Sequence, residues 1–264
     1  MNNKLNIKKY WDDQAKNFKK SPLATAPDVY YRDLEINRII GYLKNNKSVL
    51  DIGCGNGFST LKFAEKFPKS KFVGVDYSEE MIKYAKKNQA RKDEKIKKRV
   101  EFRVGNIMSL SKNREYIKKF DCVISERCVI NLKNWNEQKI ALLEIKKVLK
   151  KRGKIIFCEN TQEGLARLNG LRELHGLKPI AVRWHNYYLP QKKFLNFAKK
   201  NFIIKKINNI GSLYYIISRV VYAKLCEMEN KNPRYLHPIN KIASRLPSIG
   251  EYSPNYIFVL ENKV

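Results

Sequence analysis

The sequence has few of the residues that mark a metal site, a disulfide framework or a membrane segment. Its five cysteines stand at positions 54, 122, 128, 158 and 226, and none forms a C-x-x-C pair. Cys122 and Cys158 fall within apolar, strand-like runs, so we expect reduced thiols and no metal. No apolar run approaches the length of a membrane span, and the start MNNKLNIKKYW has no signal-peptide core. These absences favour a cytoplasmic protein.

Linkers and acidic residues are also scarce. No Gly/Ser/Pro-rich linker divides the chain, which predicts one domain over residues 1–264. Only 25 acidic residues accompany 54 lysines and arginines, for a formal charge of +29. Such a charge is typical of proteins that bind RNA or an anionic membrane surface. The excess is mostly lysine and comes with many asparagines and isoleucines, a combination that nucleotide bias also produces, and for the basic stretch 83–103 we favour a solvated face.

The most informative stretch is Asp51 to Gly57, which reads DIGCGNG. It follows a short apolar run at 48–50 that predicts a buried strand, and it precedes a helical pattern at 58–67. Alternating glycines allow positive φ and close approach to a ligand, and the following helix points free N–H groups at whatever lies in the loop. A dinucleotide fingerprint needs a glycine at the sixth place, where Phe58 stands, so a dehydrogenase is disfavoured.

The run VLDIGCGNG resembles the first motif of the class I S-adenosylmethionine-dependent methyltransferases. The next strand, Lys71 to Val75, ends in Asp76, where a nucleoside-binding sheet places a carboxylate for the ribose hydroxyls. In the family, the residue after this acid lies against adenine. At Asn106, after a strand at 100–104, the family usually has an acid that binds the adenine amino group. By the resemblance, the donor-binding residues are Asp51, Gly53, Cys54, Gly55, Gly57, Asp76, Tyr77, Met81, Asn106 and Ile107.

The resemblance spans residues 48–159. A fourth strand is predicted at 120–125 and opens into Glu126, Arg127 and Asn131, which should face the donor methyl group. A helix is predicted over Trp135 to Lys151, closed by a C-cap at Gly153 and followed by a strand at 154–158. The stretch EIKKVLKKRGKIIFCE is similar to the family segment in which "VLKPGG" is usual.

The flanking segments are predicted to cover the site. Residues 1–47 contain a helix at 6–18, in which YWDDQAKNF resembles the family's N-terminal lid, with Tyr10 and Trp11 over the donor, and an amphipathic helix at 29–45. Insertions at 160–190 and 211–255 are predicted on the acceptor side. They carry a helix at 164–176 interrupted by Gly170 and an aromatic helix at 212–222. Outside the insertions, a helix is predicted at 191–200 and strands at 202–210 and 256–260.

The predicted fold is therefore a doubly wound α/β domain with a seven-stranded, mostly parallel sheet, a lid and helical insertions. The predicted chemistry is methyl transfer from S-adenosylmethionine to an oxygen or nitrogen of a small, anionic acceptor, such as a sugar nucleotide or a phosphorylated or carboxylated metabolite, with surface-polysaccharide biosynthesis as one setting. An RNA or tRNA methyltransferase and a non-catalytic donor-binding subunit remain alternatives. The oligomeric state stays open.

Candidate general bases are His185, His175 and Glu126, because a histidine in a cleft titrates near working pH. Candidate acceptor-binding residues are aromatic or cationic for the most part, since arginine suits carboxylate and phosphate groups. They are Arg127, Asn131, Arg167, Arg183, Trp184, Tyr187, Tyr188, Tyr214, Tyr215 and Arg219.

Overall fold

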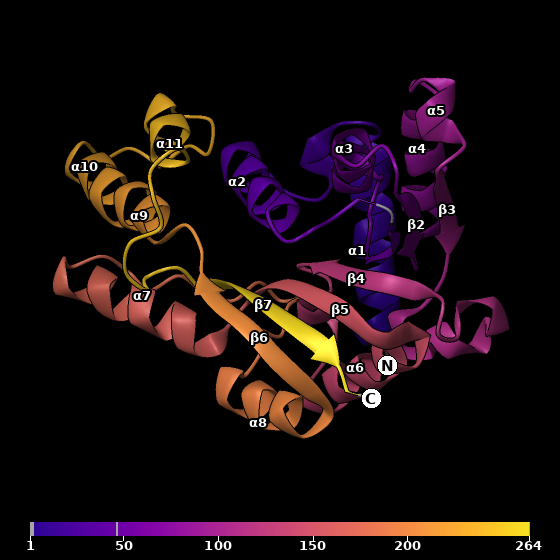
Figure 1. The fold of residues 1–264 in the computed structure, drawn as a ribbon. Coiled ribbons are helices and arrows are strands. Elements are labelled where there is room, and N and C mark those ends of the chain that lie inside the picture. The colour runs from indigo at the N-terminus through magenta and orange to yellow at the C-terminus, as the bar shows by residue number, and fades with distance from the viewer. Residues whose placement is uncertain (1–2, 46, 264) are drawn as a thin grey trace.

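The computed structural model describes residues 3–45 and 47–263, and for residues 3–6 only the backbone. The two ends of the predicted domain and position 46 lie outside the described residues. Seven strands form one sheet in the order β3-β2-β1-β4-β5-β7-β6 (Figure 1). The strands are β1 (Ser48–Ile52), β2 (Lys71–Asp76), β3 (Val100–Val104), β4 (Phe120–Glu126), β5 (Leu149–Asn160), β6 (Phe202–Asn209) and β7 (Asn255–Asn262).

The first five strands are parallel, and β7 pairs antiparallel with both β5 and β6. This arrangement confirms the predicted seven-stranded, mostly parallel sheet with a closing antiparallel pair. The carboxyl ends of β1, β2, β4 and β5 meet at one edge, where ligands of open α/β sheets bind.

Helices cover both faces of the sheet. The α-helices are α1 (Asn3–Phe18), α2 (Val29–Ile40), α3 (Phe58–Lys66), α4 (Glu79–Gln89), α5 (Glu94–Lys97), α6 (Trp135–Val148), α7 (Gln162–Leu174), α8 (Gln191–Asn201), α9 (Ser212–Tyr215), α10 (Tyr222–Met228) and α11 (Pro238–Ala243). Shorter turns are η1 (Pro22–Ala24), η2 (Ile107–Lys112), η3 (Arg114–Tyr116), η4 (Val129–Asn131) and the π-helical η5 (Ile216–Val221).

Two hydrophobic cores lie against the two faces of the sheet. Side chains alternate along each strand, so Val49 faces the core built with α2, α3 and α4, while Leu50 and Ile52 face the core built with α6 and α8. Burial on both faces explains why β1 and β4 have apolar residues on both sides of the strand rather than an alternating polar pattern.

One predicted helix end is wrong. Helix α6 ends at Val148 rather than Lys151, and β5 begins at Leu149. Leu149 pairs with Phe120 of β4, so the basic residues extend the strand instead of the helix. The positive φ falls on Arg152, at 58°, and Gly153 is no helix cap. Backbone pairing at the sheet edge therefore outweighs the local signal for a C-cap.

The insertions also differ from the prediction in detail. Helix α7 runs through Gly170 without a break, because one glycine costs a helix only about 1 kcal/mol and Leu165 and Leu168 anchor its inner face. The aromatic helix extends past residue 222, since α9, η5 and α10 follow one another as far as Met228. The amphipathic helix before β1 ends earlier than predicted, at Ile40.

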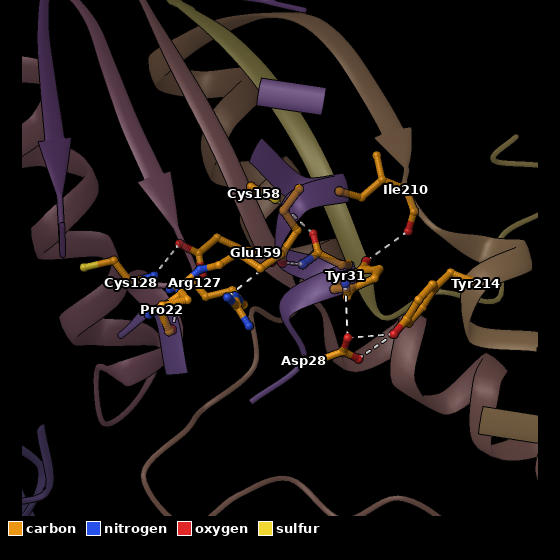
Figure 2. A network of polar contacts seen from close by, with 12 residues as sticks. Pro22, Asp28, Tyr31, Arg127, Cys128, Cys158, Glu159, Ile210 and Tyr214 are labelled. Atoms are coloured by element: carbon orange, nitrogen blue, oxygen red, sulfur yellow. Dashed lines mark hydrogen bonds and ion pairs between the residues drawn. The ribbon is translucent and has the colours of Figure 1, made fainter. Parts of the chain in front are cut away.

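Asp28 joins the second insertion to the N-terminal part of the chain. Its carboxylate accepts from the hydroxyl of Tyr214 at 2.7 Å and from the backbone N–H of Tyr31 at 3.1 Å (Figure 2). The same carboxylate forms an ion pair with Arg219. Tyr31 in turn donates its hydroxyl to the carbonyl of Ile210. Helices α9 and α11 are thereby held against α2, beyond the end of the sheet (Figure 1).

No helix within residues 3–45 and 47–263 has the length and apolarity to cross a membrane.

The packing of α8 provides a test of the fold. Phe194 is fully buried between α8 and the sheet, with its ring against those of Phe157 and Phe258. We expect Phe194→Ala to lower the free energy of unfolding by about 3–5 kcal/mol, through lost burial and a cavity. Leu143→Ala, on the exposed side of α6, is the control and should change it by less than about 0.5 kcal/mol. Urea denaturation measures both, and similar losses would contradict this packing.

Candidate active site

A cavity of about 490 Å³ lies at the carboxyl edge of the sheet, and its lining includes residues of the predicted lid helix α1, of α9 and of η5. It brings together most of the predicted site residues. Those lining it are Trp11, Asp51, Gly53, Cys54, Gly55, Asp76, Tyr77, Met81, Asn106, Ile107, Glu126, Arg127, Asn131, Arg183, His185, Tyr188, Tyr215 and Arg219.

The glycine loop forms one wall. Gly53 and Gly55 have φ of 68° and 55°, which other residues adopt only with strain. A Cβ on Gly53 would lie 2.5 Å from Sγ of Cys128, and one on Gly55 would lie 2.5 Å from Cγ2 of Thr25. The glycines therefore allow close approach of the chain to itself as well as to a ligand.

Gly57 has a different place. Its φ of 77° makes it the N-cap of α3, and a Cβ there would lie 2.6 Å from the ring of Phe102, away from the cavity lining. The third glycine thus serves the turn from loop to helix, and its contact with the donor stays a prediction.

Three carboxylates, those of Asp51, Asp76 and Glu126, lie at the strand ends around this loop. Asp76 accepts from the N–H of Gly55 and of Ser78, each at 2.9 Å, and Asp51 accepts from the hydroxyl of Thr60 at 2.5 Å. Burial raises the pKa of Asp51 to about 7 and that of Asp76 to about 6. Among the described residues, neither these two nor Glu126 has an ion-pair partner within 4.0 Å. The wall is therefore ready for a cationic ligand.

The predicted adenine side is apolar, with one changed detail. Met81 and Ile107 line the cavity, and the hydroxyl of Tyr77 is buried without a hydrogen-bond partner in the described chain. The side-chain oxygen of Asn106 accepts from the N–H of Met108 at 2.9 Å, where it caps η2. This contact occupies one of the positions at which the predicted adenine amino group would bind.

The predicted lid helix, α1, contacts Asn131 and His185, two residues predicted to lie on the acceptor side. The indole N–H of Trp11 donates to Oδ1 of Asn131 at 3.2 Å, and the ring of Tyr10 stacks on His185 at 4.3 Å. Tyr10 is absent from the cavity lining, so of the two predicted lid aromatics only Trp11 faces the cavity. Asp12, the residue after Trp11, accepts a hydrogen bond from the hydroxyl of Ser78 at 2.5 Å.

The loop after β4 is held by Glu159, at the end of β5. Its fully buried carboxylate accepts from the N–H of Cys128 at 3.1 Å (Figure 2). It also accepts from the hydroxyl of Ser125 at 2.5 Å and from the N–H of Val129 at 3.0 Å. Burial nevertheless raises the pKa of Glu159 to about 7. The loop in turn places Arg127 at a φ of 54°.

Two pairs of opposite charge lie beside this loop. Arg127 forms an ion pair of 3.2 Å with Glu35, a fully buried residue of α2 whose pKa is raised by that burial. Arg219 is paired with Asp28, and its guanidinium lies 4.9 Å from the ring centre of Tyr235. Oε1 of Glu126 and Nε of Arg127 are buried without a hydrogen-bond partner among the described residues. Both residues line the cavity.

His185 is a neutral imidazole in this setting. It is 5% exposed, and its Nδ1 has no hydrogen-bond partner in the described chain. Burial, together with the nearby positive charge of Arg183, lowers its pKa to about 4. The histidine can accept a proton at neutral pH but is a weak base.

The structure places five further predicted residues outside the cavity lining. His175 is the exposed C-cap of α7, and Trp184 is exposed and touches Tyr10. Arg167 donates to the carbonyl of Glu251, which ties α7 to the segment before β7. Tyr187 forms hydrogen bonds through its backbone N–H and carbonyl groups, and Tyr214 is fully buried. The predicted roles of these five residues therefore have no support from the cavity lining and stay predictions.

Four residues that line or support the cavity were not predicted from the sequence: Asp28, Arg32, Glu35 and Glu159. Three of them belong to the start of α2 or to the helix itself, whose amphipathic pattern gives no sign of a buried charge. Arg32 is 4% exposed, lines the cavity and has an unpaired Nε in the described chain. Glu159 did carry a signal, because it follows a strand as Asp76 does.

Comparisons with known proteins agree with this fold. A family model for a methyltransferase domain matches residues 43–237. Malonyl-(acyl-carrier protein) O-methyltransferase of Priestia megaterium is 25% identical over 256 residues, which cover 97% of this chain and 84% of that protein. Protein-lysine N-methyltransferase EFM4 of Saccharomyces cerevisiae is 34% identical over 96 residues, which cover 31% of this chain and 42% of that protein.

The chain spans about half the length of other curated relatives it matches. Uncharacterized methyltransferase C1B3.06c of Schizosaccharomyces pombe is 31% identical over 166 residues, 55% of either protein. Among solved structures, magnesium protoporphyrin IX methyltransferase (ChlM) of Synechocystis PCC 6803, determined with bound SAH, has a TM-score of 0.63 and 14% identity, covering 99% of this chain and 100% of that one.

The family match covers more than half of the chain, and the observed strand order and glycine loop are consistent with it. The chain therefore belongs to the methyltransferase-domain family, the class I enzymes that use S-adenosylmethionine as the methyl donor.

Proposed function

We propose that this protein transfers the methyl group of S-adenosylmethionine to an oxygen or nitrogen atom of a small, anionic acceptor. The observation that carries the proposal is that one cavity joins the glycine loop to the side chains of Arg127, Arg183 and Arg219. A sugar nucleotide or a phosphorylated or carboxylated metabolite has the chemistry for this cavity.

The donor end of the cavity fits S-adenosylmethionine. Asp51, Asp76 and Glu126 are carboxylates without an ion pair in the described chain, and the donor carries an ammonium and a sulfonium group. Asp76 has lone pairs left for ribose hydroxyls beside its two backbone contacts, and Met81 and Ile107 offer apolar surface to adenine. In this proposal Gly53 and Gly55 leave room for the ligand backbone.

The acceptor end carries the positive charge. Arg127 and Arg219 keep their carboxylate partners, so Arg183 is the residue best placed to bind an anionic group. It lines the cavity, it is exposed, and no ion pair is formed by it within the described residues. The planar guanidinium of arginine matches carboxylate and phosphate oxygens. Tyr188 and Tyr215, which also line the cavity, can stack on a ring of the acceptor.

The chain contributes mainly position and exclusion of water. Bound S-adenosylmethionine supplies a methyl group that is already activated for transfer. Alignment of the acceptor by surrounding side chains is worth on the order of 7–11 kcal/mol in such reactions. If the acceptor atom starts protonated, Glu126 and His185 are the cavity groups with unpaired proton-accepting atoms in the described chain. We assign the proton to one of these two.

The glycine loop gives the first test. We expect Gly55→Ala to weaken binding of S-adenosylhomocysteine about tenfold or more, because the new Cβ meets Thr25 and the positive φ is strained. Gly170→Ala is the matched control, since nothing lies within 4 Å of a Cβ at that helical position. Isothermal calorimetry measures the affinities, and thermal melts report folding. Equal affinity in the two variants would contradict the assigned donor site.

His185 gives a pH test. Its folded pKa of about 4 lies below the ordinary histidine pKa of 6.5, so the unfolded chain binds more protons between these limits. The stability it contributes is thus present above the unfolded pKa and is lost as the pH falls toward about 4. We expect His185→Gln to flatten the rise of unfolding free energy across this window, whereas His175→Gln at an exposed site should not. A titrating His185 signal near 6.5 by NMR would refute the low pKa.

Arg183 tests the acceptor class. We expect Arg183→Ala to impair methyl transfer while leaving the affinity for S-adenosylhomocysteine unchanged. Labelled donor offered with a metabolite extract, total RNA and total protein, over a salt series, identifies the class that is methylated. RNA bound through six or more phosphates would lose about 10³-fold in affinity between about 50 and 200 mM salt. Salt-sensitive labelling of RNA, or labelling of protein alone, would overturn the small-acceptor proposal.

A further inference from the structure

The helices that cover the acceptor side have an apolar outer surface. On α10 and the residue before it, Val221, Leu225 and Met228 are exposed at i, i+4 and i+7, one stripe of a helix. Leu236 and Ile242 continue the exposed apolar side chains over the following loop and α11, which packs against η5 (Figure 1). Met228 and Ile242 are 72% and 64% exposed. We call these five side chains the roof surface.

The fold does not need this stripe. The opposite side of α10 already packs inward through Tyr222, Ala223 and Cys226, which are all buried. A helix that is apolar on both sides normally has a partner on each. Exposed apolar side chains gathered in this way mark an interaction site.

Positive charge without acidic partners accompanies the roof surface. Arg234, Lys241 and Arg245 are exposed, and in the part of the chain that the structure describes they form no ion pair. Lys224 and Lys231, by contrast, are paired with glutamates of the same segment. Arg234 stands two residues before Leu236, and Lys241 directly precedes Ile242. Cationic side chains interleaved with aliphatic ones are typical of segments that lie in a membrane interface.

We propose that the roof surface docks on an anionic lipid membrane. The apolar side chains would enter the headgroup boundary while Arg234, Lys241 and Arg245 meet lipid phosphates. A second copy of this chain is a poorer occupant, because a two-fold contact would bring the same cations of both copies together in a protein of formal charge +29. Charge therefore selects the lipid surface over self-association.

The roof surface adjoins the active site. Tyr235, next to Leu236, lines the cavity and lies over the guanidinium of Arg219. An acceptor held in a membrane would thus reach the cavity beside the docked surface. The docking itself is independent of the acceptor proposed above, since vesicle binding is measured without methyl transfer.

Co-flotation with vesicles tests the proposal. The full chain is mixed with phosphatidylcholine vesicles with and without phosphatidylglycerol, and we expect it to float only with the anionic ones, less so as salt rises. Leu225→Asp should reduce the bound fraction strongly, and Ile140→Asp on α6 should not, although these residues are 50% and 49% exposed. The pair Lys241→Glu with Arg245→Glu should weaken partitioning about tenfold or more. Lys192→Glu with Lys193→Glu, on α8, is its control.

Thermal melts and binding of S-adenosylhomocysteine verify that each variant is folded. Flotation that is absent, or that falls equally in the α8 charge control, would overturn the proposal. So would sedimentation that shows a dimer broken by Leu225→Asp, because the roof surface would then bind a second copy.

Discussion

The acceptor side of the cavity depends on the carboxylate of Glu159. This carboxylate accepts hydrogen bonds from the hydroxyl of Ser125 and from the N–H groups at the start of η4. The end of β5 therefore determines how the chain leaves β4. The loop it holds carries Glu126 and Arg127, one with a free oxygen and the other in a left-handed conformation. A buried acid with several donors is thus used to build a loop, at the cost of a raised pKa.

The buried charges beside this loop follow from the same constraint. Arg127 leaves the loop toward α2, where burial without a counter-charge would be costly, and Glu35 supplies the counter-charge. Asp28, one helix turn before Arg32, does the same for Arg219 from the second insertion. Helix α2 therefore connects two segments that are nearly a hundred residues apart, and it provides Arg32 to the cavity as well.

The core of the fold and the cavity wall around the glycine loop were predictable because local patterns decide them. Glycines at Gly53 and Gly55, an apolar strand before them and an acid at Asp76 form a signal within thirty residues. The acceptor side was predictable only in part: Arg183, His185 and Arg219 do line the cavity, whereas Arg167 and His175, equally attractive in sequence, point elsewhere. Their placement depends on how α7 meets β7, which no local pattern records. The predicted end of α6 was wrong for a related reason, since strand pairing at Leu149 overrode the helix signal.

The contact between the lid and the acceptor side has a kinetic consequence. The indole of Trp11 is hydrogen-bonded to Asn131 and the ring of Tyr10 stacks on His185, so movement of α1 disturbs two residues that line the proposed acceptor space. Any exchange of the nucleoside past this helix breaks a hydrogen bond and an aromatic contact that border the other substrate's space. The two substrates would then not come and go independently: an occupied acceptor space favours a closed α1, and the departure of one product facilitates that of the other.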